Sequence, residues 1–224
     1  MGMTIFTLIK SGSAEHIRQL QDDGLMFFNT LAYYQRIEDD CLRGDQDEGA
    51  HSVYQSSDVR LVIGTGSAAH TIDQSSELVD IVKIAMDSDA DTNVYCMTAI
   101  TDSNLGPVDL RNFKFGDTFL VLTNTTEFFD RVKRTVSQNG FGLRSQLVEY
   151  IHRSSYSGQM GVFRKFSQFE YQSEYRLVLD QKSGKPYRLR IGSIKDISAV
   201  GPASEFNDFL DIKHKDEPIH NETR

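Results

Sequence analysis

Residues 117 to 140, "DTFLVLTNTTEFFDRVKRTVSQNG", form the segment that most restricts how this chain can fold. The run "FLVL" is apolar without interruption, and Asn124, a residue type favoured at helix N-caps, follows soon after it. Glu127 stands three residues later, as in a capping box, and apolar residues then recur at helical spacing. Gly140 favours a helix end. The segment therefore predicts a buried strand that leads directly into an amphipathic helix.

The elements around this pair indicate an α+β fold. Helices cluster early and strands dominate later, without the regular alternation that a parallel doubly wound sheet requires. We expect a single α+β domain, mostly antiparallel, over residues 1–212, followed by a polar tail over 213–224. The other expected elements are strands at 4–10, 25–28, 52–56, 59–64 and 93–101, strands near 147–152, 159–165, 170–179, 186–191 and 196–200, helices at 14–24, after Asn29 or Thr30 and within 204–212, and a strand or a helix at 77–86.

Several functional classes are excluded by what the sequence lacks. The longest apolar runs are far shorter than the roughly 18 residues of a spanning helix, so we expect no membrane insertion. The first residues lack a basic start and a long apolar stretch, so we expect no signal peptide. The two cysteines, Cys41 and Cys96, are too few for a disulfide framework and favour a reducing, cytoplasmic setting. Six scattered histidines offer no metal-ligand spacing. "GTGSAAH" at 64–70 lacks the lysine of a P-loop and favours a hairpin loop.

Charge is distributed unevenly along the chain. The formal net charge is −8, yet residues 131–195 hold 13 Lys and Arg against four Asp and Glu. A basic region inside an acidic chain either complements the acidic part or holds an anionic ligand. The overall acidity argues against a general nucleic-acid binder.

The stretch "FEYQSEYRLVLD" at 169–180 predicts a strand with an unusual polar face. Alternation places Tyr171, Ser173, Tyr175, Leu177 and Leu179 on one side. It places four polar residues on the other side: Glu170, Gln172, Glu174 and Arg176. This face is either solvated, as is common in antiparallel sheets, or it lines a polar cleft.

The segment "YYQRIEDDCLRGDQDEG" at 33–49 also leaves two interpretations open. It is a solvated charged turn, or it is an acidic loop that closes on a ligand or coordinates a hard cation. Tyr34 and Arg36 are its candidates for contacts with a bound cofactor.

Three stretches resemble, in order, an uncharacterised domain family of bacteria and phages: "GLMFFNTLAYY", "VYCMTAITD" and "FRKFSQFEYQSEYRLVL". The family has no settled activity to carry over. The chain departs from its pattern at Gln172, where the family has Glu, and in "NTLAYY". The matching positions are Phe28, Asn29, Cys96, Thr98, Lys165, Phe169, Tyr171, Glu174, Tyr175 and Arg176.

The layout and the "QSE" at 172–174 also resemble the ADP-ribosyltransferases. That resemblance implies NAD as substrate, with Glu174 stabilising an oxocarbenium-like transition state and Gln172 orienting the acceptor. Arg176 or Arg164 would hold the pyrophosphate. In that fold an early strand supplies an Arg or His to NAD, and the nearest residues here are Lys10 and Ser11. The alternative is a non-enzymatic module that recognises a nucleotide, a nucleic acid or a protein partner.

Overall fold

The computed structural model describes residues 3–36, 47, 49–72, 81–86, 91–181 and 183–210. The predicted tail at 213–224 lies outside these residues, as do Cys41 and most of the charged segment at 33–49. The first part of the 77–86 run lies outside them too, as do residues 87–90 of "DSDADTN" at 87–93, a segment whose composition predicts a turn.

The described chain confirms an α+β fold built mostly from antiparallel strands. Its α-helices are α1 Ala14–Asp23, α2 Leu31–Arg36, α4 Thr125–Gln138 and α5 Phe206–Phe209. Its strands are β1 Ile5–Gly12, β2 Leu25–Thr30, β3 Ser52–Gln55, β4 Leu61–Ile63, β5 His70–Ile72, β6 Ile81–Ile84, β7 Asn93–Thr101, β8 Thr118–Leu122, β9 Leu143–Leu147, β10 Glu149–Ile151, β11 Gly158–Gln159, β12 Arg164–Phe166, β13 Glu174–Leu179, β14 Tyr187–Arg190 and β15 Ser198–Pro202. The 3₁₀ helices are η1 Ser56–Asp58, η2 Gly66–Ala68, η3 Leu110–Phe115, η4 Ser167–Gln172, η5 Lys195–Ile197 and η6 Ala203–Glu205.

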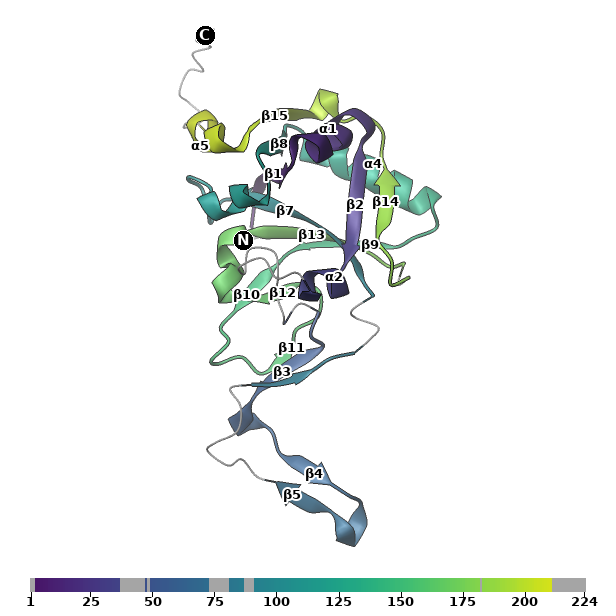
Figure 1. The fold of residues 1–224 in the computed structure, drawn as a ribbon, viewed down its shortest axis with the longest axis vertical. Coiled ribbons are helices and arrows are strands. Elements are labelled where there is room, and N and C mark those ends of the chain that lie inside the picture. Colours follow the sequence, from purple (N-terminus) through teal and green to yellow (C-terminus); the bar gives the residue numbers. More distant parts are fainter. Residues whose placement is uncertain are drawn as a thin grey trace.

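The main sheet has eight strands and divides along one edge of β7 (Figure 1). On that edge β1 pairs with the end of β7, with Ile9 opposite Thr98, whereas β2 pairs only with its start, with Asn29 opposite Val94. Neither strand pairs with β7 between those points. The other edge of β7 is covered continuously by β13. The sheet therefore opens between β1 and β2, and helix α1 connects these two strands.

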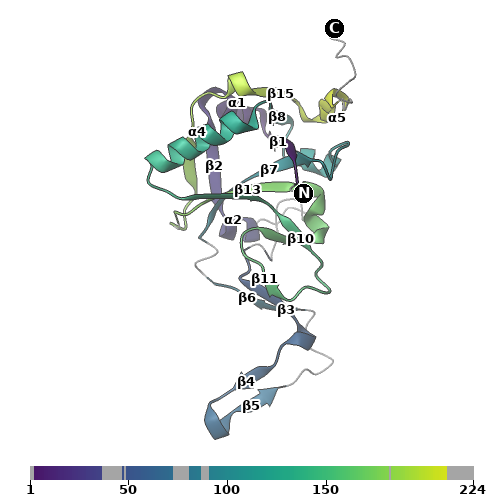
Figure 2. The same cartoon turned by 180° about the vertical axis from the view of Figure 1, so that it is seen from behind.

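The largest core cluster lies between this sheet and two helices. Helix α4 buries Phe128, Val132 and Val136 against it, as the sequence predicts, and Figure 2 shows α4 lying across the sheet. Local caps also follow the prediction, since Asn124 Oδ1 accepts a hydrogen bond from Glu127 N at 3.0 Å. None of the described helices is long and apolar enough to cross a membrane.

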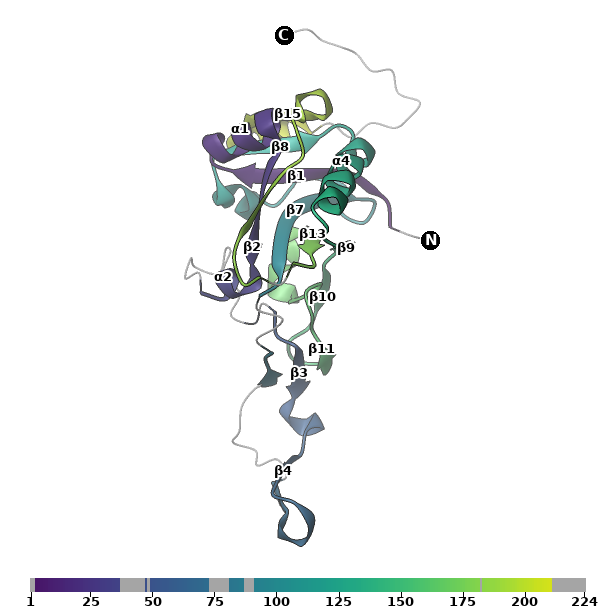
Figure 3. The same ribbon diagram turned by 90° about the vertical axis from the view of Figure 1, so that its right-hand side faces the viewer.

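Residues 52–72 and 81–86 form an arm that projects from the main sheet (Figures 1 and 3). Strand β3 pairs with β6 and β11, and β4 pairs with β5 in a separate hairpin. Residues 81–84 of the 77–86 run therefore form a strand, and residues 64–69 connect β4 and β5 in a hairpin, as expected for this segment.

The predicted strand at 169–180 is wrong over its first five residues. Residues 167–172 form the 3₁₀ helix η4, and Ser173 adopts a left-handed conformation with φ of 43°. Long-range contacts hold this turn, because Ala99 N donates to Ser173 O at 2.7 Å and Asn104 Nδ2 donates to Ser173 Oγ at 3.0 Å. The strand begins only at Glu174. Glu170 is exposed and does not share a strand face with Glu174.

Candidate functional site

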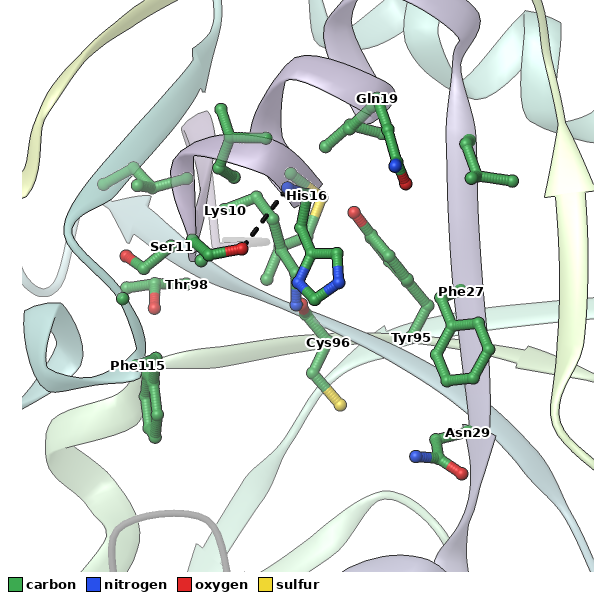
Figure 4. A pocket seen from close by; sticks show the side chains of 18 of the residues that line it. Lys10, Ser11, His16, Gln19, Phe27, Asn29, Tyr95, Cys96, Thr98 and Phe115 are labelled. Atoms are coloured by element: carbon green, nitrogen blue, oxygen red, sulfur yellow. Dashed lines mark hydrogen bonds between the residues drawn. The ribbon is translucent and has the colours of Figure 1, made fainter.

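A cavity of about 1040 Å³ lies where the main sheet opens. Residues from β1, α1, β2, β7, β13 and β14 line it. Figure 4 shows side chains of β1, α1, β2 and β7 around the cavity. At the opening Lys10 Nζ donates to the carbonyl of Cys96 at 2.7 Å and lies 4.7 Å from the centre of the Tyr95 ring. Lys10 thus satisfies a backbone acceptor of β7 that neither β1 nor β2 reaches.

A buried ionic cluster forms the floor of the cavity. Glu174 Oε1 accepts from Arg176 Nε at 2.6 Å, and Glu174 Oε2 accepts from Arg176 Nη2 at 3.2 Å. Lys165 Nζ lies 2.9 Å from Glu174 Oε2. The three side chains are 1–6% exposed. Glu174 and Arg176 lie opposite Thr98 and Cys96 of β7. Because they are two residues apart on β13, their side chains project from the same face of the strand. The polar face at 174–176 therefore lines a cavity and is not solvated.

Gln172 reaches the same cluster although it is not on the strand. Its Oε1 accepts a hydrogen bond from Lys165 Nζ at 2.9 Å, and its side chain is buried. Lys165 is thus the link between Gln172 and Glu174. The Tyr150 hydroxyl accepts from Glu174 N at 2.9 Å and fixes the start of β13.

The cluster keeps the Glu174 carboxyl ionised. Burial alone would raise the pKa of Glu174, but the charges of Arg176 and Lys165 outweigh it and hold the pKa well below its usual range. Burial raises the pKa of the Cys96 thiol to about 12, and the charge of Glu174 adds to this effect. The thiol therefore stays protonated near the Glu174 carboxylate. A carboxylate has about four lone-pair sites, and Arg176 and Lys165 supply three donors to that of Glu174.

Two walls of the cavity come from α1 and from the β2–β14 ribbon. His16, Gln19 and Asp23 line it from α1. Phe27 and Arg188 are direct cross-strand partners, and the Arg188 guanidinium lies 5.8 Å from the centre of the Phe27 ring. The cavity lining also includes Leu25, Asn29 and Arg190 from this ribbon and Tyr33 and Tyr34 from α2. The walls therefore combine aromatic rings with two arginines.

Gly116 brings another wall close to the β1–α1 turn. A Cβ atom built at Gly116 would lie 2.0 Å from the carbonyl carbon of Gly12. The two backbones therefore touch, and this contact holds Phe115 at the cavity (Figure 4). Only glycine permits such a close approach.

The structure brings together four of the six residues that the sequence predicts for the site. Glu174, Gln172, Arg176 and Tyr34 line the cavity, whereas Arg164 and Arg36 do not. Arg164 pairs instead with Glu149, at 2.7 Å, and with the carbonyl of Gln159. Arg36 is exposed at the end of α2. Residues 37–46 and 48 lie outside the described residues, so the acidic-loop hypothesis stays a prediction.

Sequence reasoning missed several residues of the cavity as site residues. Sequence reasoning selected Arg164 as a site residue and omitted its neighbour Lys165. On β12 these two side chains point in opposite directions, so Lys165 joins the cluster and Arg164 pairs with Glu149 outside it. The resemblance to the bacterial and phage family includes Asn29, Cys96 and Thr98, and all three line the cavity. The resemblance to this family was therefore the feature of the sequence that could have identified these three residues. In the described ranges, no three His, Cys, Asp or Glu side chains come close enough to hold a metal ion.

Comparisons of this chain with protein-family profiles, with curated proteins and with solved structures found no match.

Proposed function

We propose that the cavity binds a nucleotide and that the protein is an ADP-ribosyltransferase-like NAD-binding protein of a bacterial or phage conflict system. The observation that carries the proposal is the combination within one cavity of an ionised glutamate, aromatic rings and arginines. A volume of about 1040 Å³ matches the upper range of small-molecule sites, roughly 300–1,000 Å³. Arginine binds phosphate, aromatic rings stack on bases, and a carboxylate accepts from ribose hydroxyls.

The layout of the cavity supports NAD as the ligand. Lys10 and Ser11 at the end of the early strand β1 line the same cavity as Glu174 of the late strand β13. This is the relation that the ADP-ribosyltransferase resemblance implies. Tyr33 and Tyr34, from the charged segment at 33–49, also line it. Arg188 takes over from Arg164 as the candidate for the pyrophosphate, because Arg188 lines the cavity and Arg164 does not.

The hydrogen bonds of Glu174 define how a ribose would enter. Arg176 and Lys165 engage three of its lone-pair sites, and the Cys96 thiol is a near neighbour. A ribose hydroxyl would donate to the remaining lone-pair site and leave the two ion pairs in place. Glu174 would then lie against the ribose, where a negative charge stabilises an oxocarbenium-like state.

One observation favours a second candidate, a non-enzymatic nucleotide-binding module. Two cations lie within 3.2 Å of the Glu174 carboxylate and reduce the negative field that it can direct at a developing positive charge. A glutamate paired with two cations still binds a ribose hydroxyl, but it stabilises a developing positive charge only weakly. For both candidates we expect a cytoplasmic protein, since Cys96 is a free thiol.

Calorimetric titration with NAD and an assay of nicotinamide release test the proposal with the purified protein. Binding together with release supports the enzyme, and binding without release supports the binding module. In the enzyme, Glu174→Gln removes release, whereas Glu149→Gln, which changes a surface carboxylate outside the cavity, leaves it unchanged. Absence of NAD binding and of NAD cleavage by the wild-type protein would refute the proposal.

A further inference from the structure

Two buried polar side chains face the cavity with unused hydrogen-bonding capacity. Tyr95 is 4% exposed and Asn29 is 6% exposed. Within the described part of the chain, no hydrogen bond reaches the Tyr95 hydroxyl. Asn29 Oδ1 accepts from Thr30 N at 2.9 Å, which leaves the Asn29 Nδ2 amide to face the cavity. Figure 4 shows both side chains directed into it.

Both residues are nearly buried, but they line the cavity, so the polar ends of their side chains are accessible from it. Asn29 and Tyr95 lie on neighbouring strands, at the point where the sheet opens. Asn29 lies opposite Val94, so Asn29 and Tyr95 reach the cavity from the two faces of the sheet, and a ligand that spans the opening would supply partners to both.

The core holds the Tyr95 hydroxyl in a fixed position and a fixed protonation state. The ring packs 5.4 Å from the centre of Phe28, and Lys10 Nζ lies over its face at 4.7 Å. Burial raises the pKa of Tyr95 above its usual range, with a smaller contribution from Cys96, so the hydroxyl remains a donor at neutral pH. A fixed donor loses little conformational freedom when it binds a ligand.

Phe27 adds an apolar surface beside these two groups. It lies two residues before Asn29 on β2, so both side chains project from the same face of the strand. Its ring is 45% exposed and lines the cavity. An exposed aromatic ring at the edge of a polar cavity is a platform on which a planar ring stacks.

We infer that Phe27, Asn29 and Tyr95 form a recognition subsite for a planar nitrogen heterocycle. The heterocycle stacks on Phe27, presents a hydrogen-bond acceptor to Asn29 Nδ2 and binds the Tyr95 hydroxyl. This inference rests on the proposed nucleotide function and adds the part of the nucleotide that the chain recognises. NAD carries two such rings, nicotinamide and adenine, and both present acceptor atoms at their edges.

The test compares three ligands with Tyr95→Phe, which keeps the ring and removes the hydroxyl. NAD carries both rings, ADP-ribose lacks the nicotinamide and nicotinamide mononucleotide lacks the adenine. Loss of one hydrogen bond is expected to weaken binding roughly tenfold. Tyr175→Phe is the matched control, because the Tyr175 hydroxyl binds Ser145 outside the cavity. We expect the control to bind all three ligands as the wild type does.

The pattern of losses identifies the ring. Weaker binding of NAD and the mononucleotide, with ADP-ribose unchanged, assigns the subsite to nicotinamide. Weaker binding of NAD and ADP-ribose, with the mononucleotide unchanged, assigns it to adenine. An equal loss for all three ligands, or no loss for any, overturns the inference while the proposed function stands. A wild type that binds none of the three overturns both.

Asn29→Asp provides a second, independent variant. The aspartate keeps an acceptor for Thr30 N but replaces the Nδ2 donor with a second acceptor. It should therefore weaken the same ligands that Tyr95→Phe weakens. Losses confined to the ligands that Tyr95→Phe leaves unchanged would contradict a shared subsite. Thermal unfolding of each variant establishes that it is folded at the temperature of the titration.

Discussion

Replacing Glu174 with glutamine is expected to lower the free energy of unfolding substantially. The carboxylate is 5% exposed and contacts Arg176, which is 1% exposed, and Lys165, which is 6% exposed. Removing one partner of a buried ionic cluster typically costs about 3–5 kcal/mol. For a chain of this size that corresponds to a fall in Tm of roughly 6–20 °C. Urea unfolding, followed by circular dichroism, measures the change directly.

The matched control is Glu149→Gln. Glu149 pairs with Arg164 at 2.7 Å, yet its side chain is 55% exposed and solvent weakens the pair. We expect a change of about 0–1 kcal/mol. Equal effects of the two substitutions would refute the argument that burial determines what the Glu174 cluster contributes. The result also decides the temperature for the assay of nicotinamide release, since Glu174→Gln must be folded when its activity is measured.

Three further predictions follow from the same geometry. The pKa of Glu174 in the folded state lies below its ordinary value of 4.5, so its contribution to the free energy of unfolding is complete above that pH and is lost as the pH falls below it. The stability difference between the wild type and Glu174→Gln should therefore shrink below about pH 4.5. A difference that stays constant would argue against an ionised cluster. Gly116→Ala should lower the free energy of unfolding by about 1–3 kcal/mol, because the added Cβ would overlap the Gly12 backbone. Gly12→Ala should leave it nearly unchanged, because its Cβ would meet Ile17 at an ordinary contact distance of 3.5 Å. Urea unfolding of both variants measures the two effects. Arg188 lines the cavity, so Arg188→Ala should weaken NAD binding about tenfold in calorimetric titration. Arg164→Ala should leave NAD binding unchanged, because Arg164 does not line the cavity. A larger loss for Arg164→Ala than for Arg188→Ala would place the phosphates elsewhere.

Local signals in the sequence predict most of the elements. The strand and helix at 117–140 have their cap, periodicity and end within one short segment, and the structure confirms them. The turn at Ser173 has no such signal. A serine rarely adopts a positive φ, and the contacts that hold it come from Ala99 and Asn104, far away in the sequence. An interpretation based on alternation alone therefore extends the strand too far.

The site was predictable only where one strand determines it. Glu174 and Arg176 share a strand face, so alternation suffices to place them together. The choice between Arg164 and Lys165 depends on the parallel pairing of β12 with β10. The position of Arg188 depends on the pairing of β14 with β2, which brings it opposite Phe27. Neither pairing has a signature in the sequence, because each joins segments that are distant along the chain.

The position of the ionic cluster favours a functional role over a purely structural one. A buried ion pair is often no more stable than well-packed apolar residues of the same volume, so stability alone does not account for three charged groups here. Lys165, Glu174 and Arg176 form the floor of a cavity, which Phe27 and Arg188 also line. Together with the unused hydrogen-bonding groups of Asn29 and Tyr95, this arrangement is the one expected of a site prepared for a polar ligand.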